Sequence, residues 1–301
     1  MNNYIISTDT CVDFEKSYCD ENNLNLVPIN VIIDDEFYNS YDLDLDEFYS
    51  HLKSGENITT TASNPQTFED SFENILKQGQ DILHIAFSGA LSSSFGNANF
   101  AINNLKEKYP ERKIILIDSK AATNCQSLLV DIAVEMKKEG KNIDEVANKI
   151  IELTERFDVD FIIKDLFFLH KGGRVSKSQA VLGTALNINP ILTLNREGKI
   201  VQTDKVRTRK KAVKKIFDKF VEYYDRDFKS KVFISHGNSK EEAEQLRDKI
   251  LEYDKDVQVV LLNESITIAS HTGPGTLLIS YISTNPKIDW LNSRENLSII
   301  A

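Results

Sequence analysis

The sequence predicts an α/β protein of two domains, with a mostly parallel sheet in its first half. Short apolar segments rich in β-branched residues alternate there with longer helical patterns. This alternation is typical of a parallel sheet with helices on both faces. The length of 301 residues, with 41% hydrophobic and 27% charged side chains, provides enough apolar material for one large domain or two ordinary ones.

The first half of the chain alternates strands and helices in order. Strands are predicted at residues 4–8, 26–33, 81–87 and 113–118, and helices at residues 13–23, 64–78, 93–108, 123–138 and 143–157. Asn64 and Pro65 mark the start of one helix, since asparagine is a preferred N-cap and proline fits the first helical position.

The pattern changes after about residue 158. Strands are predicted at residues 159–163, 191–194, 199–203, 232–236 and 257–262, and helices from residue 208 and at residues 240–253; residues 277–282 are a further apolar segment. Residues 195–198 form a hairpin turn that ends in Gly198. We therefore predict an N-terminal α/β domain over residues 1–158 and a C-terminal α/β domain over residues 159–301. No flexible linker separates them, so we expect a packed interface, and clefts between domains are common ligand sites.

The charge balance argues against nucleic acid as a partner. Lys and Arg number 36 and Asp and Glu number 46, which gives a net charge of −10. A phosphate backbone would be repelled over most of such a surface, and so would an anionic membrane. Any anionic ligand must therefore be held by local features of the chain.

The sequence also predicts a cytoplasmic protein without a membrane-spanning segment. The first ten residues have no basic region followed by a long apolar run, and no stretch approaches about 18 uninterrupted apolar residues. Cys11, Cys19 and Cys125 have no CxxC spacing, and reduced thiols are the simplest interpretation. If this protein handles lipid, it does so as a soluble carrier.

The segment from Ser88 to Ser94 is the first candidate binding element. It follows a predicted strand and opens a helix, and a helix N-terminus offers free N–H groups to a carboxylate or phosphate. Ordinary capping by Ser92 or Ser93 explains the same residues. A nucleophile elbow does not fit, because the Gly-x-Ser-x-Gly pattern is absent.

A threonine run forms the second candidate. Residues 59–61 are all threonine and precede the helix that opens at Asn64. Capping explains Ser63 and Asn64 but not three consecutive threonines, which fit a short strand equally well.

Two basic segments point to anions. Residues 171–176 read Lys-Gly-Gly-Arg-Val-Ser, in which paired glycines permit a tight turn or a close approach of the backbone to a partner. The spacings of Walker and dinucleotide-binding loops are absent. Residues 205–215 carry seven cations around a predicted helix start, which indicates either an anionic partner or a solvated face.

His271 lies in the segment Ser-His-Thr-Gly-Pro-Gly-Thr at residues 270–276, which predicts a stiff turn. A neutral imidazole there can donate a hydrogen bond to a carboxylate, although a lone histidine is more often structural. The five histidines lack metal-ligand spacing, so we predict no metal site and no cofactor.

The order of these segments resembles the DegV family. Seven motifs carry the resemblance in sequence: residues 7–10, residues 60–65, residues 91–95, residues 117–119, residues 171–176, residues 206–208 and residues 271–275. The Lys-Gly-Gly-Arg-Val-Ser and His-Thr-Gly-Pro-Gly segments are the most specific. The resemblance covers nearly the whole chain apart from the tail after about Pro286.

The resemblance implies a long-chain fatty acid in a buried tunnel between two α/β domains. It places the acyl carboxylate on Thr60, Ser92 and His271, with Thr61 adjacent and the backbone around Ser93 as a donor of N–H groups. It also implies a separate ATP-using fatty acid kinase that phosphorylates the carboxylate. In that case Arg174 and Arg207 are expected to contact the kinase or the phosphate.

The chain departs from the family pattern at a few positions. Ser93 replaces the usual glycine of Leu-Ser-Gly-Thr, and Thr61 replaces a serine. Cys125 and Ser127 replace two glycines. These changes bear on ligand specificity more than on the fold.

Two other functions stay open at this stage. A stand-alone hydrolase would use Ser92 as nucleophile and His271 as base. An acyl-chain sensor would differ from a carrier only in its partner. We expect the carrier, which is not itself an enzyme, because no nucleotide loop and no nucleophile elbow are present in the sequence.

Overall fold

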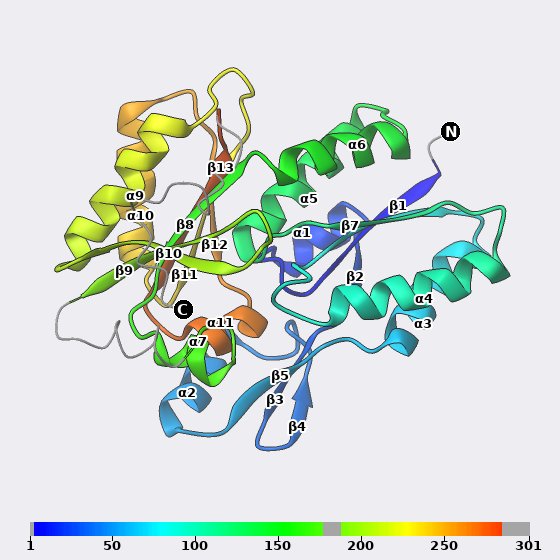
Figure 1. Ribbon diagram of the computed structural model, residues 1–301, viewed down its shortest axis with the longest axis horizontal. Coiled ribbons are helices and arrows are strands. Elements are labelled where there is room, and N and C mark those ends of the chain that lie inside the picture. The colour runs from blue at the N-terminus through cyan, green and yellow to red at the C-terminus, as the bar shows by residue number, and fades with distance from the viewer. Residues whose placement is uncertain (1–2, 177–187, 285–301) are drawn as a thin grey trace.

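A computed structural model describes residues 3–176 and 188–284 of the chain. Figure 1 shows two large sheets with their helices side by side, and a smaller sheet beneath them. The α/β class and the mostly parallel sheet of the first half are confirmed.

The first sheet is parallel and has the strand order β2-β1-β6-β7. Its strands are β1 (Tyr4–Asp9), β2 (Asn25–Val27), β6 (Asp81–Ala86) and β7 (Ile114–Asp118). Its helices are α1 (Lys16–Glu21), α3 (Pro65–Lys77), α4 (Ser94–Lys108), α5 (Thr123–Lys138) and α6 (Ile143–Thr154). Ile5 packs in the core with α3 and α4, whereas its neighbour Ile6 packs in the core with α5 and α6. Helices therefore cover both faces of this sheet.

The second sheet is mixed and has the strand order β10-β9-β8-β13-β11-β12. Its strands are β8 (Phe157–Ile162), β9 (Asn189–Leu194), β10 (Ile200–Val206), β11 (Val232–Gly237), β12 (Val259–Asn263) and β13 (Thr276–Ile282). Helices α9 (Arg209–Tyr223) and α10 (Lys240–Tyr253) cover one face. Helix α5 covers the other face and so lies between the two sheets (Figure 1).

A third, antiparallel sheet has the order β4-β3-β5. It consists of β3 (Asn30–Ile33), β4 (Glu36–Tyr38) and β5 (Ile58–Thr61), with α2 (Leu45–Ser54), α7 (Phe167–Lys171) and α11 (Ile266–Thr272) nearby. Ile266 and Ala269 of α11 share an apolar cluster with Val31 of β3 and Ile58 of β5. This small sheet therefore supports α11, the helix that carries His271.

The prediction of one strand over residues 26–33 was wrong. Strand β2 ends at Val27 and joins the first sheet, whereas β3 begins at Asn30 and joins the small sheet. Pro28 separates them, because proline has no N–H group to donate to a strand partner. The predicted helix over residues 13–23 begins only at Lys16. No pattern in the sequence had predicted α2, β4, α7 or α11.

All strands of the first and third sheets precede residue 119, and all strands of the second sheet follow residue 156. The domain boundary near residue 158 stays a prediction, since α5 packs against both large sheets. The predicted end of the second domain, at residue 301, lies outside the described residues.

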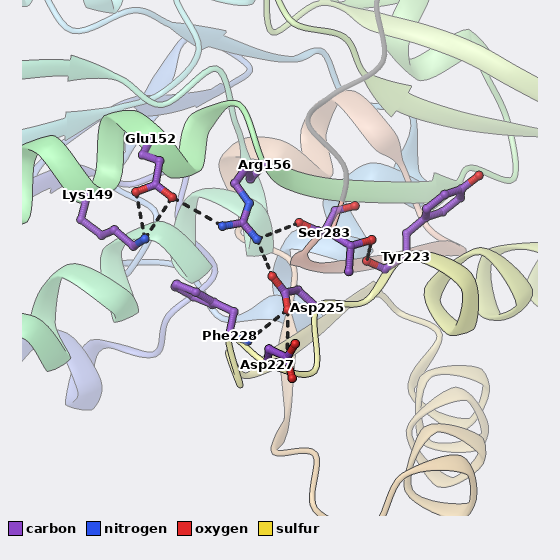
Figure 2. A network of polar contacts seen from close by, with 9 residues as sticks. Lys149, Glu152, Arg156, Tyr223, Asp225, Asp227, Phe228 and Ser283 are labelled. Carbon is purple, nitrogen blue, oxygen red and sulfur yellow. Dashed lines mark hydrogen bonds and ion pairs between the residues drawn. The ribbon is translucent and has the colours of Figure 1, made fainter.

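Arg156 joins the two halves at the point where the chain passes from one to the other. Its guanidinium donates to the Asp225 carboxylate and, at 3.2 Å, to the carbonyl oxygen of Ser283 (Figure 2). The Ser283 N–H donates to the carbonyl oxygen of Arg156 at 2.8 Å. Glu152 accepts from both Arg156 and Lys149, which extends the network along α6 (Figure 2). The end of α6 is thereby tied to the end of β13.

We expect Arg156→Ala to lower the free energy of unfolding by about 1–3 kcal/mol, because it leaves the largely buried Asp225 carboxylate without its cation. Urea unfolding measures the change. Lys16→Ala is the control, because the Lys16–Asp20 pair is exposed and screened by solvent, so its loss should change stability little. Equal losses in the two variants would contradict the role given to Arg156.

Candidate functional site

A cavity lies between the first sheet, α11 and the second sheet. The free space at this position amounts to about 740 Å³ when the open solvent at its mouth is included. Its polar side chains include Thr60, Ser92, Arg174 and His271. Its apolar lining includes Ile29, Phe87, Leu91, Val159, Phe161, Leu169, Leu194, Ile200, Ile268 and Leu278. The cavity is therefore a mainly apolar space with a small polar group of residues.

Thr60 reaches the cavity from β5. Side chains alternate along a strand, so Thr60 and Ala62 face the cavity and Thr61 faces away from it. The Thr60 hydroxyl lies 2.8 Å from Nε2 of His271, at hydrogen-bond distance. The run of threonines thus forms a strand, one of the two structures that the sequence allowed.

His271 lies in the last turn of α11 and not in the stiff turn that the sequence predicted. Two buried carboxyl groups hold this helix. Asp13 accepts from the Ser265 N–H at 2.9 Å, at the start of α11, and Glu264 accepts from the Thr272 hydroxyl at 2.7 Å, at its end. Gly273 follows the helix with a φ of 73°, a conformation that favours glycine.

The imidazole of His271 is neutral near pH 7. Burial lowers its pKa, and the nearby Arg174 cation lowers it further, to about 4. A neutral imidazole carries one N–H donor and one acceptor nitrogen. Because Nε2 contacts Thr60 and the buried Nδ1 has no hydrogen-bond partner among the described residues, Thr60 is the polar partner of this ring.

Ser92 lies in the loop that connects β6 to α4. Its hydroxyl accepts from the Ser94 N–H at 3.1 Å and donates to the Ser94 hydroxyl at 3.0 Å. Ser93 is the N-cap residue of α4, is exposed, and has a φ of −73°. This φ is ordinary for any residue, so the backbone does not require the glycine that the family pattern has at this position.

Arg174 lines the cavity together with His271. Its guanidinium donates to the carbonyl oxygen of Leu91 at 3.0 Å and also to that of Gly172. These bonds fix the arginine beside the loop that carries Ser92. The resemblance placed Arg174 at a partner or phosphate contact, and the structure places it at the cavity wall.

The structure brings four of the predicted site residues to one cavity: Thr60, Ser92, Arg174 and His271. The cavity lining found within residues 3–176 and 188–284 does not include Thr61, Ser93 or Arg207. Arg207 is exposed just after β10, on the approach to α9. The prediction that these residues bind a carboxylate or a partner is not tested by their placement alone.

Gly172 contacts His271, which the sequence alone did not predict. A Cβ atom on Gly172 would lie 2.0 Å from Nδ1 of His271, so no larger residue fits beside the ring. The paired glycines had indicated a close approach of the backbone to some partner, and that partner is the imidazole. The signal was present in the sequence, but the partner was not identifiable from it.

The arrangement does not form a catalytic triad. His271 is bonded to Thr60 and Ser92 is bonded to Ser94, and in the described residues no carboxylate orients the imidazole through Nδ1. In the same part of the chain, no cluster of His, Cys, Asp and Glu side chains is suited to hold a metal ion. Nor does any described helix combine the length and apolar character needed to cross a bilayer.

Comparison with known proteins gives one consistent family. Residues 4–284 match the family model described as "Uncharacterised protein, DegV family COG1307". The DegV domain-containing protein CPE0026 of Clostridium perfringens is 34% identical over 285 residues, which cover 94% of this chain and 98% of that protein.

Solved structures show the same fold. The fatty-acid-binding DegV family protein SAG1342 of Streptococcus agalactiae is 28% identical, with a TM-score of 0.81 over 96% of this chain and 100% of that one. A DegV family protein of Thermus thermophilus, whose structure shows fatty acid binding, is 26% identical, with a TM-score of 0.82 over 93% of this chain and 99% of that one.

The low pKa of His271 predicts a pH effect on stability. The folded protein binds this proton more weakly than the unfolded chain, whose histidine titrates near 6.5. The stability that the neutral His271 provides to the folded protein is therefore complete above pH 6.5 and is lost as the pH falls toward about 4. We expect wild-type protein to lose about 2–3 kcal/mol more than His271→Gln over this range, as measured by urea unfolding. Other buried groups such as His84 and Asp13 titrate in both proteins, so parallel pH curves would contradict the assignment.

Proposed function

We propose that this chain, which belongs to the DegV family, binds a long-chain fatty acid in the cavity that Thr60, Ser92 and His271 border. The family resemblance inferred from the order of the sequence motifs is confirmed by the match over residues 4–284. The observation that carries the proposal is the combination of a mainly apolar lining with a few polar side chains in the same cavity, two of which, Thr60 and His271, are in contact. The relatives from Streptococcus agalactiae and Thermus thermophilus that bind fatty acids support it.

The polar group suits a carboxylate. When Nε2 of His271 carries the proton, it donates to the Thr60 hydroxyl oxygen, and the Thr60 hydrogen is then free to donate to the ligand. The Arg174 cation adds a favourable charge at the same wall. The loop that carries Ser92 opens α4, whose first N–H groups have no acceptor within the helix.

The apolar lining would supply most of the affinity. Each CH₂ group removed from water contributes about 0.8 kcal/mol, so a long acyl chain outweighs a hydrogen bond to the carboxylate, which contributes about 1–3 kcal/mol. In this proposal the cavity wall holds the chain, while Thr60, Ser92 and His271 fix the position of the carboxylate.

The finer part of the proposal is that the chain presents the carboxylate to a separate ATP-dependent fatty acid kinase and is not an enzyme on its own. Two features support it. First, the polar group lacks the geometry of a triad. Second, Arg207 is exposed outside the cavity, and the nearby cations Lys205 and Lys210 are exposed as well. Such a surface suits a partner or the phosphate that it transfers.

Mass spectrometry of the purified protein, under native and then denaturing conditions, tests the binding of a fatty acid. We expect a stoichiometric fatty acid that is released only on denaturation. Thr60→Val, Ser92→Ala and His271→Ala should each weaken binding by about tenfold without abolishing it, since each removes about 1–2 kcal/mol. Thr61→Val and Ser93→Ala are matched controls, because neither side chain lines the cavity, and we expect changes below about twofold. An empty protein that also refuses added fatty acid would refute the proposal.

The two arginines should separate binding from phosphorylation. Arg207→Ala should leave fatty acid affinity unchanged and slow acyl-phosphate formation by an ATP-dependent fatty acid kinase by about tenfold or more. Arg174→Ala should reduce both, because this side chain lines the cavity. Unchanged acyl-phosphate formation with Arg207→Ala would exclude that residue from the contact with the kinase.

A further inference from the structure

The apolar wall of the cavity crosses four neighbouring strands. Leu278 on β13 is paired with Phe161 on β8, and Ile200 on β10 is paired with Leu194 on β9. All four side chains line the cavity. Neighbouring strands lie about 4.8 Å apart, so the wall extends roughly 14 Å from β13 to β10.

His271 and Arg174 lie at the β13 end of this wall. Helix α11, which carries His271, ends at Thr272, and only the segment from Gly273 to Gly275 separates it from the start of β13. Arg174 follows α7, which itself follows the end of β8. The end of β8 and the start of β13 therefore mark the carboxylate edge of the sheet.

Leu194 and Ile200 lie at the opposite corner. Strand β9 runs antiparallel to β8, so its last residue, Leu194, is at the edge remote from Arg174. Ile200 begins β10 beside it. Leu194 and Ile200 are thus separated from His271 and Arg174 both across the strands and along them.

The turn between β9 and β10 is fixed against the first half of the chain. The Ser88 hydroxyl, which is fully buried, donates to the carbonyl oxygen of Gly198 at 3.0 Å. A Cβ atom on Gly198 would lie 2.2 Å from the Ser88 hydroxyl oxygen and 3.0 Å from Cα of Lys120. Gly198 also has a φ of 77°. This corner of the cavity is therefore closed by a turn that no larger residue than glycine can make without a shift.

We propose that Leu194 and Ile200, held in place by the contact of Gly198 with Ser88, form the end wall that the methyl end of the bound acyl chain meets, and so set the chain length that the cavity accepts. This inference rests on the proposed function. A fatty acid whose acyl chain stops short of the wall buries fewer CH₂ groups, and its affinity falls roughly fourfold for each CH₂ group that is missing. A longer chain must displace the wall or leave the cavity, because packed interiors do not yield readily to added volume.

The test compares the fatty acids bound by wild-type protein with those bound by Ile200→Ala and Ile200→Phe. The proteins are purified from one bacterial host and also equilibrated with a mixture of straight-chain saturated fatty acids, and the bound species are identified by mass spectrometry. We expect Ile200→Ala to shift the preferred length upward by at least two carbons and Ile200→Phe to shift it downward. Ile151→Ala is the matched control, because Ile151 is exposed on α6, and its profile should equal that of wild type.

The contact at the turn has its own matched pair. Gly198→Ala and Gly55→Ala both add a methyl group at a positive φ, of 77° and 85°, but only the first meets another residue, since nothing lies within 4 Å of the second. We expect Gly198→Ala to broaden the length profile toward longer chains and Gly55→Ala to leave it unchanged.

The outcomes separate the two proposals. Variants that carry fatty acid with the same length profile as wild type would overturn the end wall and leave the proposed function intact. A wild-type protein that carries no fatty acid and takes up none would overturn the proposed function, and the end wall with it. If Ile200→Ala does not fold, Ile200→Val replaces it, and a smaller upward shift supports the wall while no shift overturns it.

Discussion

Helix α5 is packed between the two large sheets, and the rest of the structure depends on this burial. A helix with two covered faces has little water on either side, so its polar side chains need partners inside the protein. Asn124 donates to the carbonyl oxygen of Phe233 in the second sheet, and Gln126 donates to the hydroxyl of Thr8 in the first. These two hydrogen bonds fix one helix to both sheets. The segment that opens this helix, at Ala122 and Thr123, also lines the cavity, so the position of α5 sets the space between the sheets.

Buried carboxyl groups fix the loops that border this space. Asp9 accepts from the Phe87 N–H at 2.7 Å and so holds the segment that leaves β6 toward Ser92. Asp13 and Glu264 hold the two ends of α11. Burial raises the pKa of Asp13 to about 7 and that of Glu264 well above its usual range. Glu264 therefore keeps its proton near pH 7 and does not repel an anionic ligand, and Arg174 places a cation at the cavity wall although the whole chain carries −10.

The sequence predicted those elements whose signals are local. The predicted helices over residues 123–138 and 240–253 agree with α5 and α10 to the residue, because helical patterns and end signals lie within the segments themselves. Helix α11 escaped prediction because it has only seven residues and is buried on nearly every side, which leaves no periodic pattern. The hydrogen bond between Thr60 and His271 connects residues that are 211 positions apart in the sequence. Only the family resemblance had placed these two residues in one site. The fit of Gly172 against the imidazole ring depends on tertiary packing, which neither spacing nor composition encodes.

In the proposed function, two properties of the cavity come from different parts of the fold. The polar group comes from β5, the loop before α4 and α11, and hydrogen bonds from β5 and from Asp13 to distant residues of the α11 segment leave little freedom for substitution there. The apolar wall comes from one face of the second sheet, where volume-conserving changes cost little because burial is not directional. Relatives only 26–28% identical keep the fold, with TM-scores of 0.81–0.82. Under the proposed function, substitutions on the strand face would change the acyl chain that is selected, while the carboxylate would stay in the position that a partner must reach.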